Sequence, residues 1–291
     1  MSLYIDFLDI NVLSLIIAKL NFRQFYILSK VVYLGDINYS YLIILKYGSP
    51  SVIGVINPEK NHIVTQEEYS CVLSSLILKA ELQLDNMSLK DICDLEFLNL
   101  YKVYTGFLPE EIGNLINLKK MQLYTNGINY IPREIGYLSN LERLSSYGNQ
   151  LLVLPKEIGN LIKLQHLVIN ISQISKLPRE IANLINLKIL NLDFCQFKVF
   201  PEVILDLTQL QELHLVHNFI KVIPTEIGKL VHLKELYLSY NQIITLPKEI
   251  VKLTELSRLY LRSNPIRTIP SEIIRFIRDN KVRLDISLMI G

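Results

Sequence analysis

A proline recurs every 23 residues over more than half of this chain, and that spacing constrains the fold more than any other feature. The prolines that keep the interval without a slip are Pro109, Pro132, Pro155, Pro178, Pro201, Pro224, Pro247 and Pro270. A fixed interval of this length is the signature of a solenoid, in which one small structural unit repeats and each unit packs on the next. Because solenoids display extended surface, the repeat favours binding over catalysis.

Two rows of the repeat show what each unit contains. Residues 154–176 read LPKEIGNLIKLQHLVINISQISK and residues 223–245 read IPTEIGKLVHLKELYLSYNQIIT, which share the frame LPxEIGxLxxLxxLxLxxNxIxx. In the second half of the frame, Leu236 and Leu238 alternate with polar residues, as in a short strand with one buried face. In the first half, a proline followed two residues later by glutamate suits the start of a helix. Each row is therefore predicted to form a strand, a turn and a short helix or 3-10 segment.

Two apolar columns predict the core of the array, and burying each of their side chains stabilises the fold by roughly 1.5–3 kcal/mol. One column contains Leu118, Leu141, Leu164, Leu187, Leu210, Leu233 and Leu256, and the other contains Met121, Leu144, Leu167, Leu190, Leu213, Leu236 and Leu259. Ser146 departs from the pattern, because it occupies a core position that leucine or isoleucine fills in the other full rows. A large-to-small change at such a position typically costs about 2–5 kcal/mol.

A small polar residue recurs at the turn that follows each predicted strand. The column contains Asn126, Asn149, Ser172, Cys195, Asn218, Asn241 and Asn264. Small polar side chains stacked at one depth can form hydrogen bonds with backbone groups of the turns. Because serine and cysteine are weaker substitutes for asparagine, we expect the third and fourth rows to be held more loosely there.

With this frame the chain resembles a leucine-rich repeat protein of the 23-residue LPxEIGxLxxL type. Similar rows occur in intracellular Ras-pathway scaffolds, in plant intracellular proteins and in bacterial proteins of this family. The match covers seven full rows, Leu108 to Thr268, and a weaker row precedes them with Val103 at the asparagine position. The resemblance implies an α/β solenoid, an arc with parallel strands on its concave face and short helices or 3-10 turns on its convex face.

Three segments are expected from where the period holds. Residues 1–84 do not follow it and are too apolar for a disordered tail, so we predict a small, mainly helical unit that caps the first row. Residues 85–268 are predicted to form the repeat domain, with one degenerate and seven full rows. Residues 269–291 place Val282 and Leu284 at strand core positions but lack the turn asparagine, which predicts a truncated capping row.

The N-terminal segment also resembles an F-box, the short helical motif by which ubiquitin-ligase adaptors dock on Skp1. It fits the pattern LPxxLxxxILxxLxxxDLxxLxxV without gaps, with Asp9 in place of the proline and Gln24 in place of the acid. The matching apolar residues are Leu8, Val12, Ile16, Ile17, Leu20, Phe25, Leu28 and Val31. A plain capping helix would show the same stripe, so both interpretations stay open. The F-box interpretation predicts a substrate adaptor of a Skp1-type ubiquitin ligase.

Aromatic residues recur among the side chains that are expected to point outward from the concave face. Exposed aromatic side chains with polar surroundings are typical of protein-binding hot spots, although cross-strand packing alone would also explain them. The residues predicted to contact a protein partner are Tyr101, Tyr124, Tyr147, Phe194, His214, Tyr237, Tyr240 and Tyr260. A non-enzymatic protein-interaction module is the first functional hypothesis, and row-level similarity adds a scaffold in a small-GTPase pathway as a further alternative.

Other classes of function find little support in the sequence. The net charge of +2 gives no argument for a nucleic-acid partner. No phosphate loop, HExxH, GxSxG or kinase motif set is present, so neither catalysis nor a cofactor is expected. His214 and His217 have no cysteine or carboxylate at metal-ligand spacing, so no metal is expected either. Three cysteines without CxxC spacing, no basic signal region and no apolar run near 20 residues predict a cytoplasmic protein without membrane insertion.

Overall fold

The computed structural model describes residues 42–45, 53–57, 62–63, 78, 82, 84, 87, 91–92, 94–102 and 106–286. The chain divides into two compact units, Met1–Asp94 and Leu95–Gly291. In the first unit, strands β1 (Leu42–Leu45), β2 (Ile53–Asn57) and β3 (His62–Ile63) form an antiparallel sheet in that order. The helical expectation for residues 1–84 did not include this sheet. The F-box-like residues 8–31 lie outside the described residues, so docking on Skp1 stays a prediction.

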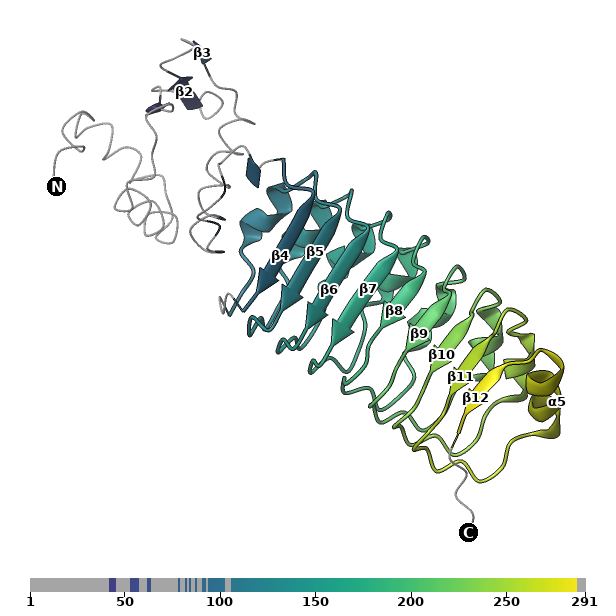
Figure 1. Cartoon of the computed structure of the whole chain (residues 1–291). Coiled ribbons are helices and arrows are strands. Elements are labelled where there is room, and N and C mark those ends of the chain that lie inside the picture. Colours follow the sequence, from purple (N-terminus) through teal and green to yellow (C-terminus); the bar gives the residue numbers. More distant parts are fainter. Residues whose placement is uncertain are drawn as a thin grey trace. The chain divides into compact units, whose positions relative to one another are not determined.

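The described part of the second unit is a sheet of nine parallel strands that follow one another in chain order, as Figure 1 shows. The strands are β4 (Phe97–Tyr101), β5 (Lys120–Tyr124), β6 (Arg143–Tyr147), β7 (His166–Asn170), β8 (Ile189–Asn191), β9 (Glu212–His214), β10 (Glu235–Tyr237), β11 (Arg258–Tyr260) and β12 (Arg283–Asp285). From β4 to β11, register pairs each residue with the one 23 positions later, as in Met121 opposite Leu144. The solenoid predicted from the proline interval is confirmed.

A 3-10 segment crosses behind the sheet in each full row. The segments are η1 (Glu110–Asn114), η2 (Arg133–Tyr137), η3 (Lys156–Asn160), η4 (Arg179–Asn183), η5 (Glu202–Asp206), η6 (Thr225–Lys229) and η7 (Lys248–Lys252). The periodic proline directly precedes each one with extended backbone, as at Pro109 with φ −67° and ψ 149°. Proline presets this φ and has no N–H to leave unsatisfied, which explains its place at the start of every segment.

The core lies between the strands and the 3-10 segments. Leucines of both predicted columns are buried completely, as at Leu141 and Leu144, and each segment adds a buried isoleucine such as Ile135. At the C-terminus an α-helix, α5 (Ser271–Asp279), takes the place of the next 3-10 segment and buries Ile273 and Phe276. Strand β12 then pairs with β11 and completes the described sheet.

The asparagines of the turn column form a ladder of buried hydrogen bonds. Asn149 Oδ1 accepts from the backbone N–H groups of Asn126 (3.0 Å) and Ile128 (3.1 Å), and its Nδ2 donates to the Leu123 carbonyl at 2.7 Å. In the two rows without asparagine, Ser172 Oγ and Cys195 Sγ contact each other at 3.1 Å instead. These two rows therefore have fewer hydrogen bonds from side chain to turn, as the sequence suggested.

Ser146 does not leave the simple defect expected from its small size. The residue is buried, and its Oγ accepts a hydrogen bond of 2.8 Å from Asn149 Nδ2. The serine thus gives the neighbouring asparagine a fourth partner, which an aliphatic residue could not do. The cost of the missing leucine is offset in part by this bond, because a buried polar group that finds a partner avoids its desolvation penalty.

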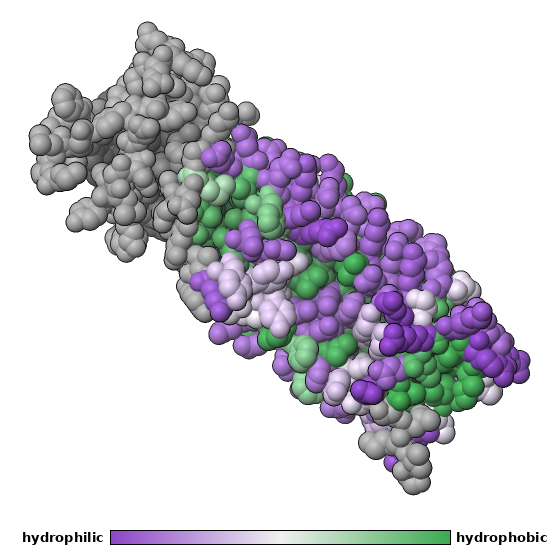
Figure 2. Space-filling view, viewed as in Figure 1, coloured by the Kyte–Doolittle hydropathy of each residue, from purple (hydrophilic) through white to green (hydrophobic). Residues whose placement is uncertain are grey.

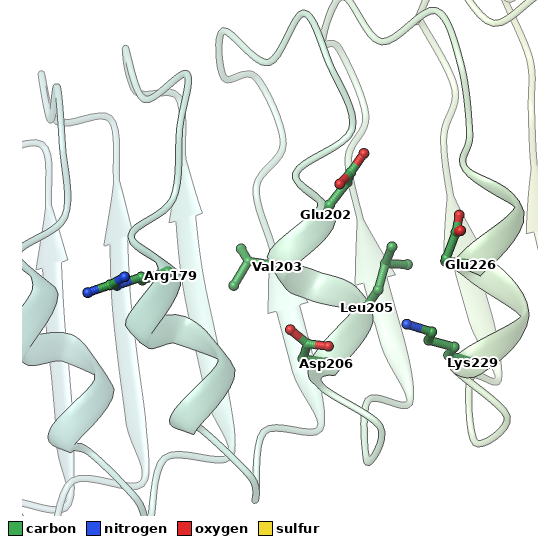
Figure 3. A pocket seen from close by; sticks show the side chains of 7 residues that line it. All are labelled: Arg179, Glu202, Val203, Leu205, Asp206, Glu226 and Lys229. Atoms are coloured by element: carbon green, nitrogen blue, oxygen red, sulfur yellow. The ribbon is translucent and has the colours of Figure 1, made fainter.

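The row of η5 breaks the pattern on the face opposite the strands. Leu205 stands where three preceding rows have Gly113, Gly136 and Gly159, and a Cβ at Gly159 would lie only 2.4 Å from the Glu180 carbonyl oxygen. Figure 3 shows the Leu205 side chain directed from η5 toward η6. Around it lies a cavity of about 420 Å³ lined by Arg179, Glu202, Val203, Leu205, Asp206, Glu226 and Lys229. The larger side chain of Leu205 explains why the rows that contain η4, η5 and η6 leave this cavity between them.

Candidate binding surface on the strand face

Alternation along each strand divides its side chains between the core and an outward surface, called here the strand face. In β5 the burial pattern runs from exposed Lys120 through buried Met121 to half-buried Gln122, and the same alternation recurs in the other strands of the repeat. Figure 2, in the orientation of Figure 1, shows polar and apolar residues interspersed over the described repeat. The strand face corresponds to the concave face of the sequence analysis.

Three aromatic residues on β9, β10 and β11 form a continuous stack on the strand face. The ring centroids of His214 and Tyr237 are 4.0 Å apart with an interplanar angle of 14°, and those of Tyr237 and Tyr260 are 4.6 Å apart at 5°. Register makes the three residues direct neighbours on parallel strands. Strand spacing of about 4.8 Å is close to the separation at which rings stack, so the repeat itself imposes the geometry.

A second stack lies just beyond the strand ends, three residues further along each row. Phe194 and His217 are 4.3 Å apart at 16°, and His217 and Tyr240 are 4.1 Å apart at 9°. These residues have positive φ of 55°, 52° and 57°. Side chains other than glycine adopt this left-handed backbone infrequently, so each row holds its turn residue in a conformation that only the surrounding repeat supports.

The left-handed position recurs in every row, and the residue types at this position did not predict it. The residues concerned are Lys102, Thr125, Gly148, Ile171, Phe194, His217, Tyr240 and Ser263. Only one is glycine, the residue that usually marks such a backbone. The preference is therefore set by stacking of the rows and not by the local residue type.

Tyr101, Tyr124 and Tyr147, on the first three strands of the repeat, do not form a parallel stack. Tyr124 and Tyr147 meet edge to face, with centroids 6.4 Å apart at 77°. Tyr101 is opposite Tyr124 in register and is 58% exposed, with the Lys102 ammonium 5.1 Å from its ring centroid. The structure thus brings Tyr124 and Tyr147 together in a T-shaped pair, while five other predicted residues belong to the two stacks together with His217.

His214 lies between two carboxylates of the strand face. Its Nδ1 is 3.9 Å from Asp193 Oδ2, and its Nε2 is 3.6 Å from Glu212 Oε2. Burial lowers the pKa of His214, an effect that the Asp193 charge opposes in part. Burial also raises the pKa of Asp193, although a 2.7 Å hydrogen bond from the Val216 N–H opposes the shift. Burial therefore favours the neutral imidazole, which forms no charged pair with either carboxylate.

Glu235 on β10 is held by two neighbours. Arg258 Nη1 donates to its Oε1 at 2.6 Å, and the Tyr237 hydroxyl donates to its other oxygen. Burial, and then the adjacent carboxylate, raise the pKa of Tyr237 to about 12. The tyrosine in the centre of the first stack is thus a neutral hydrogen-bond donor whose hydroxyl is already occupied.

One outward column was not predicted from the sequence. Each of its residues comes directly before a core residue of the Met121 column or of the equivalent position in β4 and β12. Along the strands it contains Phe97, Lys120, Arg143, His166, Ile189, Glu212, Glu235, Arg258 and Arg283. Charges of one sign are neighbours in this column, because Lys120 is opposite Arg143 and Glu212 is opposite Glu235. Writing the rows beneath one another at 23-residue spacing would have revealed the sorting.

The described residues contain no group of histidine, cysteine and acidic side chains placed to hold a metal ion. Nor does any helix among them have the length and apolar character that crossing a membrane requires. The strand face offers aromatic, charged and hydrogen-bonding groups spread over many rows, an arrangement suited to contact with another macromolecule and not to a single reacting atom.

Comparisons with known proteins agree with this architecture. Family models described as "Leucine-rich repeat region" and "Leucine rich repeat" match residues 51–172 and 208–266. An internalin (InlF) of Listeria monocytogenes is 25% identical, with a TM-score of 0.53 over 67% of this chain and 54% of its own. A leucine-rich repeat protein of Leptospira interrogans is 32% identical over 62% of this chain and 63% of its own, with a TM-score of 0.34.

A third similar structure is the leucine-rich repeat ectodomain of the plant membrane receptor kinase GASSHO1/SCHENGEN3 from Arabidopsis thaliana, in complex with CASPARIAN STRIP INTEGRITY FACTOR 2. It is 29% identical, with a TM-score of 0.52 over 62% of this chain and 25% of its own. The chain thus spans less than two thirds of the length of each of the three. No curated protein matches the chain in sequence. The repeat, the parallel sheet and the matching family models together establish that this chain is a leucine-rich repeat protein.

Proposed function

We propose that this leucine-rich repeat protein binds a protein partner through the strand face, with the two aromatic stacks as its main contact area. The observation that carries the proposal is that aromatic rings lie outside a core that is complete without them, exposed in the second stack and half-buried in the first. Phe194 and Tyr240 are 48% and 44% exposed, whereas Leu213 and Leu236 beneath the sheet are fully buried. Exposed aromatic side chains with polar neighbours are enriched where proteins bind one another.

The stacks also provide a preorganised surface. Each ring is fixed by its neighbour on the next strand, so little side-chain entropy remains to be lost when a partner binds. Ring stacking by itself contributes about 0.5–1.5 kcal/mol per pair and would account for one stack as sheet packing. The second stack is in addition exposed, at Phe194 and Tyr240, so a partner can reach its rings.

Leucine-rich repeat proteins are typically interaction modules without catalytic activity, and this chain fits that description. The plant ectodomain crystallised with a second named factor supports the use of such a repeat to bind another molecule. The scaffold role in a small-GTPase pathway stays a prediction, because only row-level similarity favours it.

The test compares proteins captured by the immobilised full chain with those captured by the double variant Tyr237→Ala, Tyr240→Ala, which removes one ring from each stack. Loss of captured proteins from the double variant is the expected result. A matched control is Tyr137→Ala, which removes a 64% exposed tyrosine from η2 on the opposite face and should leave capture unchanged. Circular dichroism confirms that each variant is folded. Capture of every partner by the double variant would exclude the strand face as the binding surface.

A further inference from the structure

We propose that the strand face binds an extended protein segment of mixed charge, with an acidic group over β5 and β6 and a basic group over β9 and β10. The inference rests on the proposed function, since it specifies the chemistry of the partner on that same face. It follows from how charged side chains are sorted in the outward column that begins each strand.

The basic block consists of Lys120 on β5 and Arg143 on β6. The two residues are exposed and directly opposite each other in the parallel register. Neither forms an ion pair with another residue that the structure describes. His166 on β7 continues the column, and burial followed by the Arg143 charge lowers its pKa. Like charges placed opposite each other destabilise a sheet. Because this block lacks a counter-charge within the described fold, the repulsion between Lys120 and Arg143 is not relieved.

The acidic block lies three strands further along the same column. Glu212 on β9 is opposite Glu235 on β10, and Asp193 lies close by on the other side of His214. Arg258 pairs with Glu235, and Glu212 Oε2 lies 3.6 Å from His214 Nε2, while the charges of Arg258 and Lys234 also act on Glu212. Burial and the neighbouring Glu235 both raise the pKa of Glu212. The three carboxylates outnumber the two cations that act on them, Arg258 and Lys234, so the block keeps a negative formal charge when His214 is neutral.

The two blocks together select the class of partner. A nucleic acid would be repelled by the acidic block, and a purely basic segment by Lys120 and Arg143. A polypeptide that carries both signs satisfies both, and only such a segment removes the two like-charge repulsions at once. Between the blocks lie Val168 on β7 and Ile189 on β8, which are half-buried and offer apolar contact to the middle of the segment.

Strand spacing fixes the separation of the two charges in the partner. Arg143 and Glu212 are three strands apart, which is about 14 Å at roughly 4.8 Å per strand. An extended chain advances about 3.3 Å per residue, so the acidic and basic groups of the segment are about four residues apart. The aromatic stacks offer a further apolar contact to any side chain of the bound segment that lies next to its basic group.

A peptide probe tests this directly. The fluorescently labelled peptide EESLSRR carries both charges at this separation, and QQSLSRR and EESLSQQ each lack one sign. Fluorescence anisotropy at low ionic strength measures the affinity of each peptide for the full chain and for its Glu212→Gln and Arg143→Gln variants. Glu212→Gln removes the charge and keeps the size of the side chain, whereas Arg143→Gln removes the charge and shortens the side chain.

The expected result is a specific pattern of coupling. Glu212→Gln weakens EESLSRR and QQSLSRR about tenfold but leaves EESLSQQ unchanged, because only the first two carry the arginines. Arg143→Gln weakens EESLSRR and EESLSQQ but leaves QQSLSRR unchanged. Lys156→Gln and Glu226→Gln, exposed charge changes outside the strand face, alter no affinity. Urea unfolding should show that Glu212→Gln is no less stable than the unsubstituted chain.

The proposal is overturned if EESLSRR binds no better than both single-sign analogues, QQSLSRR and EESLSQQ, or if the control variants weaken its binding equally. In either case the capture experiment separates the two ideas. Loss of partners from the tyrosine double variant, with no peptide coupling, would remove only the mixed-charge inference. Retention of all partners by that variant would remove the strand face as the binding surface altogether.

Discussion

Replacing Asn149 by alanine should destabilise this protein far more than its loss of a few atoms suggests. The side chain forms four hydrogen bonds in a buried environment, to Asn126, Ile128, Leu123 and Ser146. Alanine would leave two buried backbone N–H groups without the oxygen that accepts from them. Each buried donor that loses its partner costs about 1–3 kcal/mol, so the expected loss is roughly 2–6 kcal/mol of unfolding free energy.

The same column contains its own comparison. Cys195 Sγ donates to the Ile169 carbonyl at 3.3 Å and to the Asp193 carbonyl at 3.7 Å and contacts Ser172 Oγ, and no pair of backbone donors depends on it in the same way. Cys195→Ala should therefore cost about 1 kcal/mol. Asn129→Ala, at an exposed position in the same row as Asn126, should change stability by less than about 0.5 kcal/mol.

Urea unfolding followed by circular dichroism gives the three values, provided the slope of the transition stays the same among variants. A constant slope means that the variants expose the same surface on unfolding and that midpoints report stability. If Asn149→Ala and Cys195→Ala differed by less than about 0.5 kcal/mol, the buried hydrogen bonds would not be what secures the turns. The stability of the array would then come from its leucine core alone.

Three other changes have definite expected outcomes. Burial lowers the pKa of His214, so the folded state resists protonation and its stability falls as pH drops below the ordinary histidine value near 6.5. The variant His214→Phe keeps a ring in the stack and should reduce this loss of stability, measured by urea unfolding between about pH 7 and 5. An equal loss of stability in the variant would contradict the reasoning. Gly159→Ala should destabilise the protein by about 1–3 kcal/mol, because its Cβ would lie 2.4 Å from a backbone oxygen. Gly228→Ala should destabilise it less, because the atom nearest to its Cβ, at 2.9 Å, belongs to the flexible Lys252 side chain. Equal shifts of the two variants in thermal unfolding would refute the steric account. Burial raises the pKa of the Cys195 thiol to about 11, so iodoacetamide at pH 8 should modify it only after unfolding, and fast labelling of the native protein, read by mass spectrometry, would show that the thiol is accessible.

Much of the fold followed from the sequence because its determinants repeat. The proline interval set the length of one row, and the alternation at Leu236 and Leu238 placed a strand within it. Proline and the acid that follows it placed a 3-10 segment in each full row. The same information repeated seven times outweighs the weak preferences of any single row, and the defects at Ser172 and Cys195 were visible as departures from the column.

The candidate surface was predictable only in part. Alternation along the strands showed that six of the eight aromatic positions face outward, whereas Phe194 and Tyr240 lie beyond the strand ends. Whether their rings stack or meet edge to face depends on side-chain angles that each neighbour restricts, which is why Tyr124 and Tyr147 differ from Tyr237 and Tyr260. The environment of His214 could not be read from spacing, since Asp193 and Glu212 approach it from different rows.

By itself the sequence determined the repeating unit, its core columns and the residues that face outward, because these depend on periods within one row. Tertiary structure decided what depends on the stacking of rows. The left-handed backbone at Ile171 or Phe194 has no local signal, and it exists because hydrogen bonds with the next row hold it. The sorting of charge from Lys120 to Arg258 likewise has meaning only when residues 23 apart become neighbours about 4.8 Å from one another.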